Sequence, residues 1–127
     1  MTAKRNTRQR AAIEKAFEKV ARPLSPAEVC ECASASVPTL GMATVYRALN
    51  EMVDEGTLRP VELPGQSRRY EKSGLHHHHH FHCNKCDRVF DVDGCFLKKD
   101  VDLPPGFSVK DHDITLSGDC PDCNPKF

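Results

Sequence analysis

The sequence predicts an α+β fold with two small domains, on three observations. Apolar residues recur at helical spacing up to about residue 55, short alternating segments follow, and two Cys-x-x-Cys pairs enclose most of the last third of the chain. A length of 127 residues suits one ordinary domain or two small ones. We expect the boundary between residues 72 and 73, because the charge balance changes there.

Charge and histidine content distinguish the domains 1–72 and 73–127. The net charge is zero, but the first domain carries 12 Lys and Arg against 9 Asp and Glu, whereas the second carries 6 against 9 and all seven histidines. The first therefore suits a polyanionic partner and the second a cation. No apolar run approaches the roughly 20 residues of a membrane span, and no signal peptide opens the chain, so we expect a cytoplasmic protein without a membrane partner.

Two helices are expected before residue 36. Thr7 suits the N-cap of a helix over Arg8–Val20, whose apolar residues share one face: Ala12, Ile13, Ala16, Phe17 and Val20. The stretch Ser25-Pro26-Ala27-Glu28 then combines a serine cap, a proline in the first turn and a glutamate three residues after the cap. This second helix is expected to reach about Ala35 and to bury Val29, and a turn follows over residues 37–41.

A third helix is predicted over Ala43–Glu55, with Gly56 as its stop. Its apolar positions face inward: Val45, Leu49, Met52 and Val53. Its outward face offers a mixture that suits phosphates and base edges: Thr44, Tyr46, Arg47 and Asn50. An ordinary solvated helix face is the competing interpretation of that mixture.

A hairpin is predicted after the third helix. Thr57–Leu63 alternates as a strand, residues 64–67 form a turn, and Arg68–Glu71 is the return strand. Three helices and a basic-tipped hairpin make the winged helix-turn-helix arrangement, in which the third helix enters the major groove of DNA. The wing and an N-terminal arm then contact phosphates through basic residues: Lys4, Arg5, Arg8, Arg10, Arg68 and Arg69.

The two cysteine pairs predict a structural zinc site. Cys83-x-x-Cys86 and Cys120-x-x-Cys123 are separated by 33 residues, and together they offer the four thiolates of a closed tetrahedral site. A single pair can instead be a redox motif, but two pairs in a reducing compartment favour zinc. Removing the metal is expected to unfold the second domain. The other cysteines are interpreted as small buried or half-exposed residues rather than ligands: Cys30, Cys32 and Cys95.

The second domain is predicted to be a small α/β unit suited to dimerisation. Between the cysteine pairs the pattern reads as a strand over Arg88–Val92, a short helix over Gly94–Val101 and a long strand over Phe107–Ser117. Phe96 and Leu97 are expected to face inward on that helix. A further strand over Leu75–His82 would complete the sheet.

Five consecutive histidines, residues 76–80, run directly into Phe81-His82-Cys83. A purification tag explains them poorly, because tags usually sit at a terminus. On a strand successive side chains alternate, so one side carries His76, His78, His80 and His82, and the other carries His77, His79 and Phe81. Same-side neighbours lie about 6.6–7 Å apart, near enough to chelate one ion, so this strand can serve two metal sites.

These motifs resemble the ferric uptake regulator (Fur) family over about Thr7 to Cys123. The residues that carry the resemblance are Thr7-Arg8-Gln9-Arg10, Ala43-Thr44-Val45-Tyr46-Arg47-Ala48-Leu49, Arg69-Tyr70-Glu71, the histidine strand with its Cys-x-x-Cys, and Gly118-Asp119-Cys120-Pro121-Asp122-Cys123. The resemblance implies a homodimeric, metal-dependent transcription regulator that binds double-stranded operator DNA, usually a repressor of metal-uptake or stress genes.

The resemblance also implies three kinds of metal site. Structural Zn²⁺ is implied at Cys83, Cys86, Cys120 and Cys123. A second divalent metal (Zn²⁺, Fe²⁺ or Mn²⁺) is implied at a regulatory site of Glu71, His78, His80 and Asp91, at the hinge between the domains. An additional site is implied at His77, His79 and His112. Metal at the hinge is implied to fix the angle between two recognition helices, with Thr44, Tyr46 and Arg47 reaching the groove.

The chain departs from the family pattern at three positions. Arg22 or Pro23 stands where family members often supply a regulatory histidine, Ser73 is the nearest small residue to the place where zinc-sensing members often have a cysteine, and Lys98 falls near the usual glutamate of the additional site. The sequence therefore leaves open which metal is sensed, and whether peroxide is sensed through iron.

Two other classes of protein compete with the regulator. A zinc enzyme needs an open coordination position and a nearby general acid or base, and the deaminase pairing of His-x-Glu with Pro-Cys-x-x-Cys is absent from the sequence. We therefore expect no enzymatic activity and no catalytic residues. A zinc store or chaperone that does not bind DNA could use the same histidine strand.

Overall fold

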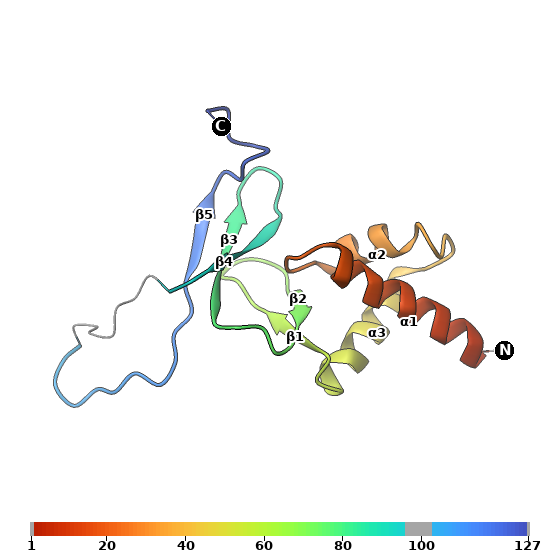
Figure 1. The fold of residues 1–127 in the computed structure, drawn as a ribbon, viewed down its shortest axis with the longest axis horizontal. Coiled ribbons are helices and arrows are strands. Elements are labelled where there is room, and N and C mark those ends of the chain that lie inside the picture. The colour runs from red at the N-terminus through yellow and green to blue at the C-terminus, as the bar shows by residue number, and fades with distance from the viewer. Residues whose placement is uncertain (1, 96–102, 127) are drawn as a thin grey trace. The chain divides into compact units, whose positions relative to one another are not determined.

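The computed structural model describes residues 2–95 and 103–126, with side chains from Thr7 onwards. The chain divides into two compact units, Met1–Gly74 and Leu75–Phe127. The first unit contains three helices and a two-stranded sheet, and the second contains a three-stranded sheet (Figure 1). The predicted α+β class is confirmed. Among the described residues, no helix combines the length and the apolar character needed to cross a membrane.

The helices of the first unit are α1 (Thr2–Lys19), α2 (Pro26–Ala33) and α3 (Met42–Asp54). The predicted start of α1 at Arg8 was wrong, because the segment before it contains alanine, lysine and arginine, which favour a helix, and no breaker. Thr7 therefore lies inside α1 and is not its cap.

The predicted start of α2 and the predicted stop of α3 are confirmed. Ser25 Oγ accepts the amide hydrogen of Glu28 at 3.2 Å, and Glu28 Oε1 accepts that of Ser25 at 3.1 Å, which is a complete capping box. Gly56 has a φ of 83°, a left-handed conformation that ends α3 without a steric penalty. The end of α2 falls at Ala33 rather than Ala35, where Ser34 donates its hydroxyl to the carbonyl of Glu31.

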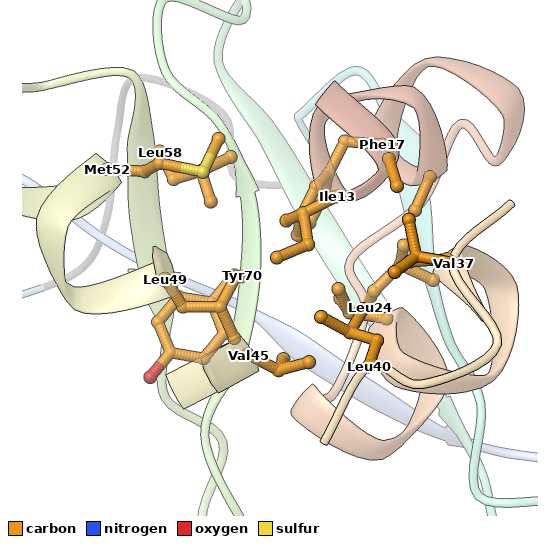
Figure 2. Close-up of a cluster of buried hydrophobic side chains, with 14 residues drawn as sticks. Ile13, Phe17, Leu24, Val37, Leu40, Val45, Leu49, Met52, Leu58 and Tyr70 are labelled. Carbon is orange, nitrogen blue, oxygen red and sulfur yellow. The ribbon is translucent and has the colours of Figure 1, made fainter. Parts of the chain in front are cut away.

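One apolar core holds the first unit together. Side chains from all three helices and from the hairpin point into it, as Figure 2 shows for Ile13, Phe17, Leu24, Val37, Leu40, Val45, Leu49, Met52, Leu58 and Tyr70. Fully burying one such side chain contributes about 1.5–3 kcal/mol. The hairpin consists of β1 (Leu58–Val61) and β2 (Arg69–Lys72), paired antiparallel, so both strands are shorter or shifted relative to the prediction.

The sheet of the second unit has the order β4-β3-β5 (Figure 1). The histidine-rich strand β3 (His78–Cys83) pairs antiparallel with β4 (Val89–Asp93) and parallel with β5 (Thr115–Gly118). The strand predicted from Leu75 therefore begins three residues later, and the strand predicted from Arg88 begins one residue later.

The long strand predicted over Phe107–Ser117 was wrong in its first half. Only Thr115–Gly118 is a strand, because β5 pairs with β3 and the register begins at Thr115 opposite His80. Phe107 and Val109 alternate as a strand would, but they are 67% and 51% exposed and lie outside the sheet. The predicted helix over Gly94–Val101, with Phe96 and Leu97, falls largely outside the described residues.

Candidate metal centres

The four cysteines of the two pairs converge at one end of the second unit. One ligand atom from each of Cys83, Cys86, Cys120 and Cys123 lies within 4.8 Å of the others, and the sulfurs of Cys86 and Cys120 are 3.7 Å apart. Zinc–sulfur bonds of about 2.3 Å in a tetrahedron place neighbouring sulfurs about 3.8 Å apart. The spacing of these residues, which we call the four-cysteine group, therefore fits zinc.

Backbone amides and burial give the four thiols different acidities. Amide hydrogens aimed at Sγ of Cys83, first that of Cys86 and also that of Cys120, lower the pKa of Cys83 to about 6. The side chain of Cys120 and burial raise the pKa of Cys123 to about 12. Four thiolates at neutral pH therefore require a cation among them, which is the chemistry of a divalent metal that displaces thiol protons.

Arg88 contacts the four-cysteine group and was not among the residues expected there from the sequence. Its Nε donates to Sγ of Cys86 at 3.1 Å, and its Nη2 lies 3.6 Å from Sγ of Cys120 and 3.0 Å from Oδ2 of Asp122. The guanidinium would thus offset the negative charge that four thiolates leave around a divalent ion. Its position two residues after Cys86 was the available signal.

His78, His80 and Asp91 form a second group, on β3 and β4. His80 is the register partner of Asp91, and Nε2 of His78 and of His80 lie 3.5 and 3.6 Å from the same Asp91 oxygen. The two imidazole centroids are 4.8 Å apart. Two imidazoles and a carboxylate are ligands for zinc, iron or manganese. Glu71, the fourth residue expected here, lies on β2 of the first unit, where Arg59 Nε is 2.6 Å from its carboxylate.

A third group contains histidines whose side chains lie on the other side of the strand from those of His78 and His80. His77, His79 and His112 lie together, with Nε2 of His77 3.2 Å from Nε2 of His112, and ring centroids 4.7 Å apart for His77 and His79. The separation of His77 and His79 from His78 and His80 follows the alternation of the strand. The backbone amide of Ile114 donates to Nδ1 of His79 at 3.1 Å, which holds that ring against the segment before β5.

Burial of the His79 ring lowers its pKa, and the neighbouring rings of His77 and His112 lower it further. The imidazole is therefore neutral at neutral pH, which is the form that binds metals. His82 has a different partner, since its Nε2 lies 2.6 Å from Oδ1 of Asp87. His76 belongs to none of the three groups among the described residues.

The interpretation of Cys95 as a buried or half-exposed residue was wrong. It is exposed rather than buried or half-exposed, and its Sγ lies 3.0 Å from Nε2 of His112, within the third group. Cys30 and Cys32 are half-buried and pack against the first unit's core, as expected. Cys95 could have been suspected from sequence, because it follows the strand that pairs with the histidine strand.

The outward face of α3 carries the residues expected to contact DNA. Tyr46 is 48% exposed and Arg47 is exposed, on the side opposite the buried Val45 and Leu49. Nη2 of Arg47 donates to Oγ1 of Thr44 at 3.2 Å. In the hairpin, exposed Arg68 donates to Glu62 at 2.6 Å. Arg69, also expected to contact DNA, is only 1% exposed and donates to the carbonyl of Ser67 at 2.9 Å, so its guanidinium is not presented to a DNA backbone in this structure. Arg8 is exposed on α1.

Comparison with known proteins identifies the family. The model of the family described as "Ferric uptake regulator family" matches residues 2–117. The chain belongs to the ferric uptake regulator family. This is a family of regulators, so the expectation of a protein without enzymatic activity is confirmed at the level of the family.

The Fur relatives differ in how much of their length the chain covers. The ferric uptake regulation protein of Campylobacter upsaliensis is 30% identical over 68% of this chain and 58% of its own length. The zinc uptake regulation protein of Mycobacterium tuberculosis (strain ATCC 25618 / H37Rv) is 31% identical over 94% of both chains. The ferric uptake regulator of Francisella tularensis, solved with iron, is 27% identical with a TM-score of 0.65, over 91% of this chain and 90% of that one. The chain spans somewhat more than half of the first Fur relatives it matches.

Proposed function

We propose that the chain is a metal-responsive, DNA-binding transcription regulator, a repressor of metal-uptake or stress genes that acts in the cytoplasm. The observation that carries the proposal is the group of His78, His80 and Asp91 in a chain that belongs to the Fur family across both units. A metal bound by this group would be the signal, and operator DNA bound by the first unit would be the output.

The first unit is proposed to act as a winged helix-turn-helix domain. Three helices on one core are followed by an antiparallel hairpin, and α3 presents Thr44, Tyr46 and Arg47 outward. These side chains would reach the major groove, and phosphate contacts would come from basic residues of α1 and the hairpin: Lys4, Arg5, Arg8 and Arg68. Of the two hairpin arginines, Arg68 is the one available to a phosphate, because its side chain is exposed whereas Arg69 is buried.

Metal is proposed to control DNA binding by joining the two units. Glu71 would complete the regulatory site with His78, His80 and Asp91, and only six residues separate Glu71 from His78 along the chain. A metal that binds only the joined form would increase its population, and coupling of this kind typically changes affinity about 5–150-fold. Zinc in the four-cysteine group would be structural, because all four positions are protein ligands.

Zinc is the metal we propose first for the regulatory site. The similarity to the zinc uptake regulation protein extends over 94% of both chains, whereas the first ferric relatives are matched over little more than half of their length. Imidazole and carboxylate ligands accept iron and manganese as well, so the site chemistry also permits an iron-dependent, peroxide-sensing regulator.

A second copy of the chain is proposed to cover the apolar surface of the second unit. Phe107, Val109 and Leu116 are 67%, 51% and 39% exposed, and Leu116 lies on the edge strand β5. Exposed apolar side chains beside an unpaired strand edge favour association. A homodimer would also supply the two recognition helices that a two-fold operator needs.

The proposal is tested by DNA binding of variants. A duplex selected from random sequence with the zinc-loaded protein is titrated with wild type, His80→Ala and Glu71→Ala, with and without added zinc. Zinc is expected to tighten wild-type binding at least about fivefold and to leave both variants unchanged. His76→Ala is the matched control, since His76 is exposed and outside the three groups, and it should respond as the wild type does.

Two results would contradict the proposal. If His80→Ala kept the full zinc response, the regulatory site would be elsewhere. If no duplex were enriched with any metal while the protein bound several zinc ions, a zinc store or chaperone would be the better explanation.

A further inference from the structure

We propose that Cys95 is the fourth ligand of the additional site implied at His77, His79 and His112, and that its thiolate closes this site and makes it selective for zinc. The four residues come from three places in the second unit: the start of β3 with the residue before it, the segment after β4, and the segment before β5. The inference concerns this unit alone and does not rest on the regulatory role proposed for His78, His80 and Asp91.

The distances fit a tetrahedral ion with small adjustments. One ligand atom from each residue lies within 4.8 Å of the others. A tetrahedral zinc places two nitrogens about 3.3 Å apart, and a nitrogen and a sulfur about 3.6 Å apart. The nitrogens of His77 and His112 are 3.2 Å apart, and Cys95 Sγ is 3.0 Å from His112 Nε2, so the second pair would separate by roughly half an ångström.

The local structure orients the four side chains toward one point. The amide of Ile114 holds the His79 ring at 3.1 Å, and that ring is fully buried. Asp111 Oδ1 accepts the amide hydrogen of His112 at 2.8 Å, which fixes the backbone that carries the His112 ring. Asp113 Oδ1 lies 4.0 Å from Nδ1 of His79, so an acidic group stands near a site where one thiolate offsets only half of a divalent charge.

The thiolate distinguishes this site from the group on the other side of β3. His78, His80 and Asp91 offer nitrogen and oxygen, which suit iron and manganese as well as zinc. A cysteine ligand shifts the preference toward softer ions, and four protein ligands leave no coordination position for water or substrate. The third group is therefore expected to select zinc over manganese and iron, and to serve structure rather than catalysis.

A metal ion at this site would stabilise the two ends of the connection between β4 and β5. Cys95 lies two positions after the end of β4, and His112 lies three positions before the start of β5, so one ion would hold both residues to the histidine strand. The described part of the second unit buries little apolar surface there, since Phe107 and Val109 are exposed. A metal cross-link would hold the described part of this connection, in which Phe107 and Val109 do not pack into a core.

Cobalt provides a direct test, because cobalt bound to a thiolate gives a sulfur-to-metal charge-transfer absorption in the near ultraviolet. The intact protein, with zinc retained in the four-cysteine group, is titrated with Co²⁺, and its zinc content is measured after the titration. The regulatory ligands contain no sulfur, so charge-transfer absorption at constant zinc content reports Cys95. The wild type is expected to gain this absorption with one equivalent of cobalt, and added zinc should remove it.

Three variants complete the test. Cys95→Ser should lose the absorption and bind the ion more than about tenfold more weakly, since even residues that only support ligands change affinity 10–100-fold. Cys95→Asp should retain binding without the absorption. His76→Ala should behave as the wild type. The inference is overturned if the wild type shows no charge transfer beyond the four-cysteine group, or if Cys95→Ser keeps it at wild-type intensity.

Discussion

The two units are held together by different kinds of interaction. In the described part of the chain, every residue of the continuous apolar core belongs to the first unit. In the second unit the buried apolar residues are Val89 with Cys83 and Cys120, and the buried polar residues include His79, His80 and His82. The first unit therefore gains its stability from hydrophobic burial, and the second is built from groups that a metal would organise.

The largest effect is expected from removing the structural metal, which should unfold the second unit and leave the first unit folded. Cys86→Ser, or extraction of zinc by a chelator, is expected to unfold β3, β4 and β5, because metal binding in small zinc domains supplies about 10–16 kcal/mol of folding free energy. Amides of α1–α3 should stay protected in hydrogen exchange while those of β3–β5 lose protection. Cys32→Ser, at a half-buried cysteine outside the metal groups, is the control. Protected β3–β5 amides in zinc-free protein would show that the metal does not hold the second unit together.

A substitution in the apolar core of the first unit is expected to destabilise that unit and to leave the zinc of the second unit in place. Leu49 is fully buried on α3, so Leu49→Ala should lower the free energy of unfolding of that unit by about 2–5 kcal/mol. Denaturant unfolding followed by circular dichroism measures the loss, and elemental analysis should find unchanged zinc content. Asn50→Ala, at the exposed neighbour, should have little effect on either. A zinc loss that accompanied Leu49→Ala would show that the units do not differ in this way.

Arg88 offers a finer test of the second unit. Because it donates to Sγ of Cys86 and Cys120, Arg88→Ala should weaken zinc binding at the four-cysteine group about 10–100-fold. Competition with a chromophoric chelator measures the change. Lys85→Ala removes a nearby exposed cation that lies 3.4 Å from the carbonyl of Cys123 and 3.6 Å from Asp119 Oδ2, and it should leave zinc affinity close to wild type. If both substitutions weakened zinc binding equally, the loss of a nearby positive charge, and not the hydrogen bonds of Arg88, would explain the change.

The smallest effect is predicted for the loss of a surface ion pair of the first unit. Arg10 Nη1 donates to Glu55 Oε1 at 2.8 Å, and this hydrogen bond lowers the pKa of Glu55 below its ordinary value of 4.5. The pair therefore contributes stability above pH 4.5 that is lost as the pH falls through the lowered pKa in the folded state. Glu55→Gln should lower Tm slightly near neutral pH at low salt, and the difference should vanish in acid or at high salt. If the Tm difference between Glu55→Gln and the wild type grew in acid, folding would raise the pKa of Glu55 instead of lowering it, and the stabilising role of the ion pair would be contradicted.

Local chemistry made part of the fold predictable from the sequence. The capping box at Ser25 and the stop at Gly56 depend on residues within a few positions of each other, and both were found in the structure. The extent of β5 could not be predicted, because a strand needs a partner strand, and the register of β5 with β3 begins at Thr115. Alternation at Phe107 and Val109 carries no information about that partner.

The same distinction applies to the metal groups. The four-cysteine group follows from two short spacings, and the division of the β3 histidines between two groups follows from strand parity. Asp91 and His112 were expected from the family resemblance. The place of Cys95 beside His112 depends on how the chain returns between β4 and β5, which spacing does not determine. Arg88 was missed for a related reason, since its contact with Cys120 joins positions 32 residues apart along the chain.

Zinc affinity measured with and without DNA is the most direct test of the proposed coupling between metal and operator. If metal at His78, His80 and Asp91 favours DNA binding by the first unit, thermodynamic linkage requires DNA to tighten zinc binding by the same factor. Zinc titrations of the protein, its four-cysteine group already filled, are compared in the presence and absence of the selected duplex. We expect an affinity at least about fivefold higher with DNA, equal to the factor by which zinc tightens DNA binding. Identical zinc affinities with and without bound duplex would contradict the coupling.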